Sequence, residues 1–166
     1  MITAYIALGS NLQNPPEQLR TALDAIDALP RSKRLRTSSF YRSEAVGPGE
    51  QPDYLNAALA LETQLPAREL LRELQAIEQS RGRVREQRWA ARTLDLDILL
   101  YGRQVIDSPD LCIPHPRMTQ RNFVLYPLLE IGGAELLLPD GRELGTLMAS
   151  CPRGDLAISQ LRTSGT

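Results

Sequence analysis

The stretch Thr93-Leu94-Asp95-Leu96-Asp97-Ile98-Leu99-Leu100 decides how this chain folds, because apolar residues alternate there with two carboxylates. A period of two is that of a β-strand with one face toward a core. Asp95 and Asp97 then project from the other face, about 6–7 Å apart at a rise of roughly 3.3 Å per residue. The apolar side chains that we expect to face the core are Leu94, Leu96, Ile98 and Leu100.

Outward from this strand, similar patterns predict three more strands, over residues 2–8, 35–43 and 54–62. A helix follows the first of them, with Asn14 as its cap, prolines in its first turn and Pro30 as its stop. A second helix starts at Pro66 and ends near Gly82. The order β-α-β-β-α-β predicts an α+β, ferredoxin-like fold, in which helices cover one face of an antiparallel sheet.

A C-terminal extension follows this unit. We expect a small hairpin over residues 101–106, helices that begin at Asn122 and Glu143, and fraying of the last dozen residues, which hold few apolar anchors. The segment 45–52, rich in glycine and proline, is expected to be a loop. A length of 166 residues with 42% hydrophobic residues suits a single domain over residues 1–166.

Charge and cysteine content exclude several classes of protein. A net charge of −1 provides no global field to attract nucleic acid or an anionic membrane. The N-terminus has no basic segment followed by an apolar one, and no run approaches the roughly 18 apolar residues that span a bilayer. Cys112 and Cys151 form neither a metal-like pair nor a disulfide framework. We therefore expect a cytoplasmic monomer that binds neither nucleic acid nor membrane.

The paired carboxylates have two interpretations. Aspartate is depleted in strands, so Asp95 and Asp97 at positions i and i+2 act against local propensity. Bare carboxylates at that spacing repel each other, and Mg²⁺, which prefers oxygen ligands with positions left for phosphate, would remove the conflict. A solvated strand face answered by nearby arginines is the alternative, and the pair alone supports both equally.

An arginine-rich segment directly precedes the acidic strand. Residues 81–92 contain five arginines and Trp89, the only tryptophan of the chain. Such a run is usually a solvated surface when it stands alone. Next to two carboxylates, however, it supplies guanidinium groups that neutralise the charge of a phosphoryl group in transfer. Trp89 could then cap a bound ring.

Other nucleotide and hydrolase motifs are missing from the sequence. There is no G-x-x-x-x-G-K-[ST] segment, no G-x-G-x-x-G segment after a strand and no G-x-S-x-G segment. His115 is the only histidine, which excludes zinc sites built on several histidines. Two prolines flank it in an extended segment, where it either donates to a phosphate or packs at a loop corner. Tyr54 and Phe123 either stack on a flat ligand, with Asn56 at its edge, or belong to the core.

Motifs along the chain, taken together, resemble those of 6-hydroxymethyl-7,8-dihydropterin pyrophosphokinases. They include Gln51-Pro52-Asp53-Tyr54-Leu55-Asn56-Ala57, Arg88-Trp89-Ala90-Ala91-Arg92 with the acidic strand after it, and Pro114-His115-Pro116-Arg117. Further matches lie at residues 4–11 and 121–125, in the same order, and the resemblance extends to about Gly141. Ala90-Ala91 departs from a frequent Gly-Pro, and Asp110 and Cys112 stand where a basic residue and a hydroxyl often contact the nucleotide.

The resemblance implies an enzyme of tetrahydrofolate biosynthesis that transfers pyrophosphate from ATP to the pterin hydroxymethyl group and releases AMP. The residues alone do not distinguish attack at the β-phosphorus from attack at the γ-phosphorus. By analogy, Asp95 and Asp97 would hold two Mg²⁺ ions, while Arg83 and Arg92 would stabilise charge on the transferred group.

The resemblance also implies the other contacts of the two substrates, pterin and ATP. The pterin would lie against Ser43, Val46, Gly47, Tyr54, Asn56, Trp89 and Phe123. The nucleotide would lie against Gln75, Glu78, Arg85, Arg88, Trp89, Ile98, His115 and Arg121. Loops around Gly47 and Arg85 would close to exclude water.

Two other readings remain open from the residues. A palm-like nucleotidyl transferase also carries two aspartates on a sheet, but it would release inorganic pyrophosphate. An RNA-binding module on a ferredoxin-like sheet needs exposed aromatic residues and a basic face. The third strand offers only Tyr54 for that purpose, and the net charge is slightly negative.

Overall fold

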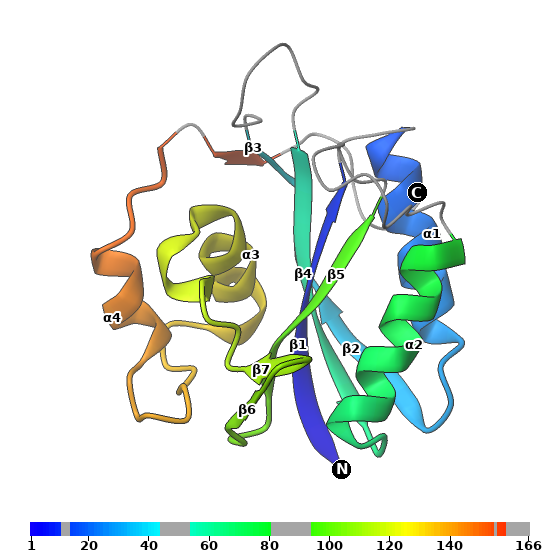
Figure 1. The fold of residues 1–166 in the computed structure, drawn as a ribbon. Helices are drawn as coiled ribbons and strands as arrows, with labels where there is room; N and C mark the ends of the chain where they lie inside the picture. Colours follow the sequence, from blue (N-terminus) through cyan, green and yellow to red (C-terminus); the bar gives the residue numbers. More distant parts are fainter. Residues whose placement is uncertain (11–13, 44–53, 81–93, 155, 159–166) are drawn as a thin grey trace.

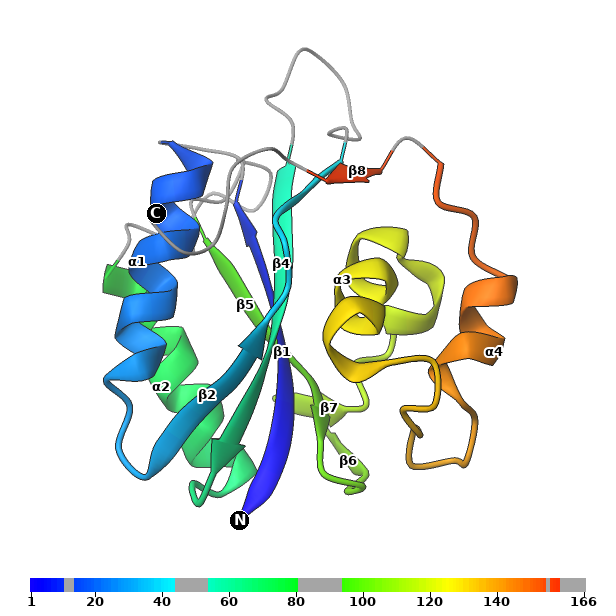
Figure 2. The same ribbon diagram turned by 180° about the vertical axis from the view of Figure 1, so that it is seen from behind.

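The central feature of the fold is an antiparallel sheet, seen edge-on between two layers of helices (Figures 1 and 2). The computed structural model describes residues 1–10, 14–43, 54–80, 94–154 and 156–158. The strands follow the order β5-β1-β4-β3-β8, and β2 also pairs with β4. Their bounds are β1 Ile2–Ser10, β2 Ser32–Thr37, β3 Tyr41–Ser43, β4 Tyr54–Thr63, β5 Asp95–Tyr101 and β8 Ala157–Ile158.

Two helices complete the expected ferredoxin-like unit, α1 (Pro15–Asp27) and α2 (Ala67–Ser80). Both begin at or just after the predicted prolines and lie on the same side of the sheet (Figure 1). The order β-α-β-β-α-β and the antiparallel pairing of β1, β2, β4 and β5 confirm the predicted fold class. No helix within these described ranges is long and apolar enough to cross a membrane.

The start of α1 differs in one detail from the prediction. Asn14 makes no side-chain capping bond to the helix backbone, and its φ of 63° places it in the left-handed region that asparagine tolerates. Its Nδ2 instead donates to Glu17 Oε2 at 3.1 Å. The two prolines still begin the helix, because they have no backbone N–H that would need an acceptor there.

The predicted strand over residues 35–43 is two strands. The backbone of Ser38 leaves the β2 ladder, and its N–H donates to the carbonyl oxygen of Ala58 at 2.8 Å while its Oγ accepts the Ala58 N–H at 2.9 Å. Phe40 fills the interruption and is fully buried. Both β2 and β3 pair with β4, so the break changes the strand count but not the topology.

A β-bulge in β5 corrects the predicted alternation. Tyr5 pairs with Leu100 and Ile6 pairs with Ile98, which leaves Leu99 as the extra residue. Leu94, Leu96 and Ile98 lie in the core under α1 and α2, as expected. Beyond the bulge the alternation of the side chains is reversed. Leu100 packs on the α3 face of the sheet, so its predicted place beside Leu94, Leu96 and Ile98 was wrong. Tyr101 lies in the core under α1 and α2 instead.

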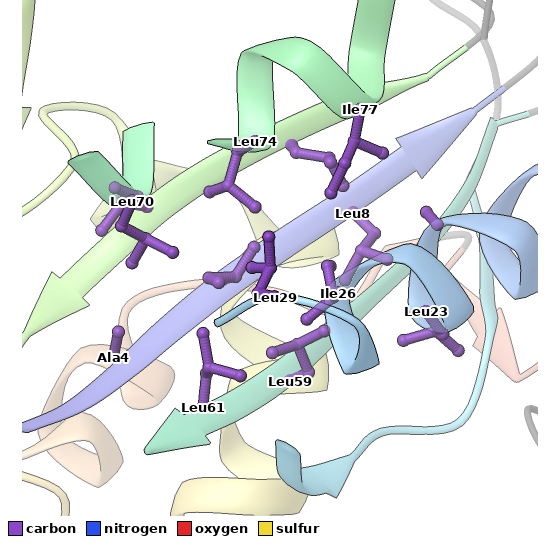
Figure 3. Packing of buried hydrophobic residues seen from close by; sticks show 14 of the residues in the cluster. Ala4, Leu8, Leu23, Ile26, Leu29, Leu59, Leu61, Leu70, Leu74 and Ile77 are labelled. Carbon is purple, nitrogen blue, oxygen red and sulfur yellow. The ribbon is translucent and has the colours of Figure 1, made fainter. Parts of the chain in front are cut away.

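Helices cover both faces of the sheet, not one. The larger core fills the space between the sheet and α1 and α2, and Figure 3 shows Leu8 and Leu59 of the sheet and Leu74 of α2 among the side chains that fill it. The C-terminal extension supplies the second layer. The extension consists of β6 (Ile106–Ser108), β7 (Leu111–Ile113), the 3₁₀ helix η1 (Met118–Gln120), α3 (Asn122–Gly132) and α4 (Leu144–Ala149). Its helices form the second layer, whereas Leu111 and Ile113 of β7 pack in the larger core.

The extension confirms some predictions and corrects others. Helices begin at Asn122 and directly after Glu143, as expected. The small hairpin forms over β6 and β7, later than the predicted 101–106, since the chain first turns at Gly102 with a φ of 56°. Among the last dozen residues, Ala157 and Ile158 pair with β3 and do not fray, whereas residues 155 and 159–166 lie outside the described ranges.

One carboxylate ties α3 to the sheet. Glu130 accepts a hydrogen bond from the Tyr41 hydroxyl at 2.6 Å and two more from the backbone N–H and the hydroxyl of Ser39, at 2.8 and 3.1 Å. Burial, together with this bond, raises the pKa of Tyr41 well above its ordinary value. Near the same end of α3, Arg36 Nη1 donates to the carbonyl oxygen of Ile131 at 3.1 Å. These bonds hold the second half of α3 against β2, β3 and the link between them.

We expect Glu130→Ala to lower the free energy of unfolding by about 1–2 kcal/mol, because it removes the acceptor of several hydrogen bonds. Urea denaturation followed by circular dichroism measures this change. Glu135→Ala, at an exposed position beyond α3, is the control and should stay within about 0.5 kcal/mol of the parent. Equal effects of the two substitutions would show that the Glu130 bonds do not anchor α3.

Candidate active site

Polar side chains line up across three strands on the α3 face of the sheet. Gly9 of β1 pairs with Asn56 of β4 on one side and with Asp95 of β5 on the other. Two residues earlier on β1, and so on the same face of the sheet, Ala7 pairs with Asp97. Residues directly opposite each other in a sheet point to the same face. Two residues beyond Asn56, Ala58 packs with α3, which identifies the face. An amide and two carboxylates therefore flank a strand that offers only small residues.

The two carboxylates share this face, as the alternation predicts. Asp95 is half-buried and Asp97 is exposed, whereas Leu96 between them is buried in the opposite core. Their oxygens are the hard ligands that Mg²⁺ prefers, so the donor set fits that ion. No group of three or more His, Cys, Asp or Glu in the described ranges could hold a metal. A cation at this pair would therefore need further oxygens from a ligand or water.

Asn56 is held in a defined orientation. Its side chain is 5% exposed, and Nδ2 donates to Ser43 Oγ at 2.8 Å. A Cβ added at Gly9 would lie 3.3 Å from Asn56 Oδ1, so the absence of a side chain at Gly9 makes room for this amide. Tyr54 pairs with Ser43 and lies on the same face as Asn56, two residues away along β4. The three predicted pterin contacts on β3 and β4 therefore lie together.

His115 lies on the outer side of β5, next to the carboxylates. Its backbone N–H donates to the carbonyl oxygen of Leu99 at 3.1 Å, and Met118 donates back to His115, so the segment is a turn and not the expected extended stretch. Burial lowers the pKa of His115, the charge of Asp97 opposes this by raising it, and the charges of Arg121 and Arg117 lower it further.

The tautomer of His115 follows from its neighbour. The ring Nδ1 accepts the backbone N–H of Arg117 at 3.3 Å. In the neutral imidazole the proton is then on Nε2, which becomes a hydrogen-bond donor. His115 therefore carries a donor near the Asp97 carboxylate and near two arginines, and a donor accompanied by positive charge suits an anionic ligand.

Arg121 and Phe123 lie where the chain enters α3. The guanidinium carbon of Arg121 lies 5.6 Å from the centroid of the Phe123 ring, within the range of a cation–π contact. Phe123 is half-buried and packs against the core beneath α3. One face of its ring is thus covered by Arg121, so only the other face could stack on a ligand.

The predicted nucleotide contacts on α2 and β5 lie elsewhere. Glu78 is buried, and its Oε2 accepts the backbone N–H of Leu96 at 2.8 Å. Gln75 is half-buried one turn earlier on α2. The Ile98 side chain is in the core under α1 and α2, on the opposite face from Asp97. The structure therefore does not bring these side chains onto the face that carries Asp95 and Asp97.

Several predicted site residues lie outside the described ranges. They are Val46, Gly47, Arg83, Arg85, Arg88, Trp89 and Arg92. Asp110, which departs from the family pattern, accepts hydrogen bonds from Arg68 Nη1 at 2.6 and 2.7 Å, and these bonds lower the pKa of its carboxyl group. Gly9, which directly follows the strand expected over residues 2–8, was not predicted as a site residue, although a glycine within a strand often marks close approach of another group.

Fold and site together define a ferredoxin-like α+β protein with an oxygen-rich site on one face of its sheet. The comparisons with known proteins support this fold. The chain belongs to the 7,8-dihydro-6-hydroxymethylpterin-pyrophosphokinase family, whose model matches residues 5–133.

Curated relatives cover most of the chain. A protein of Pseudomonas aeruginosa is 51% identical over 148 residues, which are 89% of this chain and 91% of the relative. One of Haemophilus influenzae is 53% identical over 89% of this chain and 92% of the relative. One of Bacillus subtilis is 45% identical over 77% of each chain. All three are called 2-amino-4-hydroxy-6-hydroxymethyldihydropteridine pyrophosphokinase.

Among solved structures, a crystal structure of "HPPK-DHPS in complex with substrates" matches with a TM-score of 0.70 at 12% identity. The match covers 90% of this chain but only 45% of that one. A second, of Plasmodium falciparum HPPK-DHPS, has a TM-score of 0.68 at 12% identity over 90% of this chain and 43% of that one. At such low identity these matches support the shared fold alone.

The electrostatic coupling of His115 can be tested directly, because it is the only histidine. In cation-free buffer, Asp97→Asn should lower the His115 pKa, since it removes a charge that raises it, and Arg121→Ala should raise it. Titration of the imidazole NMR signals measures both changes. Arg103→Ala, at an exposed position after β5, is the control and should leave the pKa unchanged. Opposite signs would contradict the placement of these side chains.

Proposed function

We propose that this protein transfers pyrophosphate from ATP to the hydroxymethyl group of 6-hydroxymethyl-7,8-dihydropterin, in a reaction that depends on Mg²⁺. The products are AMP and the pterin diphosphate. Membership of the pyrophosphokinase family and the names of the relatives support pyrophosphate transfer in folate biosynthesis. The observation that carries the proposal is the row Asn56–Gly9–Asp95, because it aligns an amide that could bond the edge of a heterocycle with a carboxylate that could hold Mg²⁺.

The pterin would bind over β1 and β4. Asn56 donates one amide hydrogen to Ser43 Oγ. The side chain of an asparagine also has a second amide hydrogen and a carbonyl oxygen, which can bond the edge of a heterocycle. Tyr54 and the open face of Phe123 supply flat surfaces for stacking. The small side chains of β1 leave the ring room to approach the sheet. The hydroxymethyl group would then point along the row toward β5.

The triphosphate would bind over the start of β5. Asp95 and Asp97 would hold two Mg²⁺ ions, which would neutralise the charge of the phosphates. His115 would donate its Nε2 hydrogen to a phosphate oxygen, and Arg121 would add positive charge beside it. The same residues would orient the phosphate chain toward the acceptor hydroxyl, and orientation is a large part of catalysis in phosphoryl transfer.

The remaining assignments rest on the family resemblance. Arg83 and Arg92 would stabilise charge on the transferred group. The other proposed contacts are Val46 and Gly47 with the pterin, Trp89 with both substrates, and Gln75, Arg85 and Arg88 with the nucleotide; the buried side chains of Glu78 and Ile98 are not among them. We further propose that residues 1–166 form one domain that acts as a cytoplasmic monomer. Free thiols at Cys112 and Cys151 are consistent with a reducing compartment.

Product analysis tests the reaction type. The protein mixed with ATP, Mg²⁺ and the hydroxymethyl pterin should form AMP, which chromatography of the nucleotides detects. ADP would indicate transfer of a single phosphate, and release of inorganic pyrophosphate would indicate a nucleotidyl transferase. Either product in place of AMP rejects the proposed reaction.

Asp97→Ala tests the role of the carboxylates. It should lower kcat by about 100-fold or more, the scale of losing one electrostatic contact to a transition state. Pterin binding, measured by fluorescence titration, should stay close to that of the parent, because Asn56 and Tyr54 are on another strand. Unchanged turnover would remove the role assigned to Asp97.

Gly9→Ala tests whether the pterin binds next to Asn56. The added methyl group would press on Asn56 Oδ1 at 3.3 Å and weaken pterin affinity. We expect a loss of about five-fold or more, since one extra methyl group in a tight site costs about 1–3 kcal/mol. Thr3→Ala, near the other end of β1, is the control. Undiminished pterin binding by Gly9→Ala would place the ring away from Asn56.

A further inference from the structure

Glu78 is a buried carboxylate that bonds the backbone of the acidic strand. It lies near the end of α2, its side chain is 4% exposed, and its Oε2 accepts the backbone N–H of Leu96 at 2.8 Å. Burying a carboxylate is costly unless hydrogen bonds compensate for lost water. A residue kept there at that cost invites a functional explanation, and its bonding partner indicates one.

The bonded N–H belongs to the peptide unit that joins Asp95 to Leu96. β5 is at one end of the strand order, and an edge strand presents N–H groups that no neighbouring strand takes up. Glu78 takes the place of such a neighbour. On the inner side, Gly9 pairs with Asp95 and Leu8 pairs with Leu96. The first peptide unit of β5 is therefore held from both of its edges.

Holding this peptide unit orients the carboxylates on either side of it. A planar peptide couples the last backbone angle of Asp95 to the first of Leu96, so its orientation sets where the Cα–Cβ bonds point. Asp95 is also the first residue of β5, and strand ends lose their pairing most easily. Without the Glu78 bond, the spacing between the carboxylates of Asp95 and Asp97 would vary more.

We propose that Glu78 is a positioning residue, which acts through the Leu96 N–H to keep Asp95 and Asp97 in place for a divalent cation. This inference rests on the proposed function of the carboxylate pair. In this role Glu78 acts as a hydrogen-bond acceptor, and the negative charge of its side chain is not required. It differs in this respect from a direct contact between Glu78 and the nucleotide.

Two substitutions separate acceptor from charge. Glu78→Gln keeps a side-chain oxygen of the same reach without the charge, whereas Glu78→Leu keeps a similar size without any acceptor. Glu78→Leu should lower kcat and raise the Mg²⁺ concentration for half-maximal rate, by about 10–100-fold, as loss of an outer contact to a metal ligand does. The KM for pterin should stay near the parental value. Glu78→Gln should restore most of both losses.

Two readouts do not need turnover. In cation-free protein, hydrogen exchange of the Leu96 amide, followed by NMR, should be slow in the parent and Glu78→Gln and faster in Glu78→Leu. Calorimetric binding of Mn²⁺ with a non-hydrolysable ATP analogue should weaken only in Glu78→Leu. Leu70→Ala, about two turns earlier in α2, controls for lost stability. It should lower the unfolding temperature without changing Leu96 exchange or Mn²⁺ affinity.

Two results would overturn the proposal. If Glu78→Gln is as impaired as Glu78→Leu, the charge of Glu78 is needed, as in a direct contact with nucleotide or metal. If the Leu96 amide exchanges equally slowly in Glu78→Leu, the bond does not hold the strand. Should the parent form no AMP, the proposed function fails, while amide exchange and Mn²⁺ affinity still decide the role of Glu78.

Discussion

The register of three strands is the constraint on which the rest of this molecule depends. β4, β1 and β5 are aligned so that Asn56, Gly9 and Asp95 form one row. The neighbouring row, which includes Leu8 and Leu96, is buried in the core under α1 and α2. A slip by one residue would exchange the two faces and bury carboxylates among leucines. The hydrophobic core therefore determines the register, and the register assembles the polar site.

The second layer of helices covers part of the sheet face that carries this polar row. α3 crosses the face that carries the row, with Arg121 and Phe123 at its beginning and Glu130 near its end. The bonds from Ser39 and Tyr41 to Glu130 fix that end to the strands that also position Ser43.

Much of the fold follows from local patterns that the sequence displays openly. Alternation around Asp95 and the prolines before α1 and α2 predict elements that the structure contains. The bulge at Leu99 could not be predicted, because its neighbours Ile98 and Leu100 are also apolar and either phase of the alternation buries apolar side chains. The interruption between β2 and β3 at Phe40 could not be predicted either. A buried apolar residue there is compatible both with a continuous strand and with a break whose side chain fills the core.

The features of the candidate site also differ in whether they could be predicted from local sequence. That Asp95 and Asp97 share a face is a local property of one strand, and the sequence was sufficient to predict it. That Asn56 donates to Ser43, or that His115 lies beside Asp97, depends on pairing between segments far apart in the chain. Such relations became predictable only through resemblance to a family. The role of Gly9 is of this second kind, since a glycine in isolation does not reveal which side chain approaches it.

The bulge at Leu99 has a consequence for how this family can vary. The bulge lies between the carboxylates of β5 and Tyr101. The side chains on its two sides therefore alternate between the faces of the sheet independently of each other. The carboxylate end is aligned by β1 and Glu78, the other by Tyr5 and the turn at Gly102. A change of length in the hairpin beyond β5 is therefore expected to leave the orientation of Asp95 and Asp97 unchanged. The irregularity separates the half of β5 that carries the carboxylates from the half that leads into the turn at Gly102.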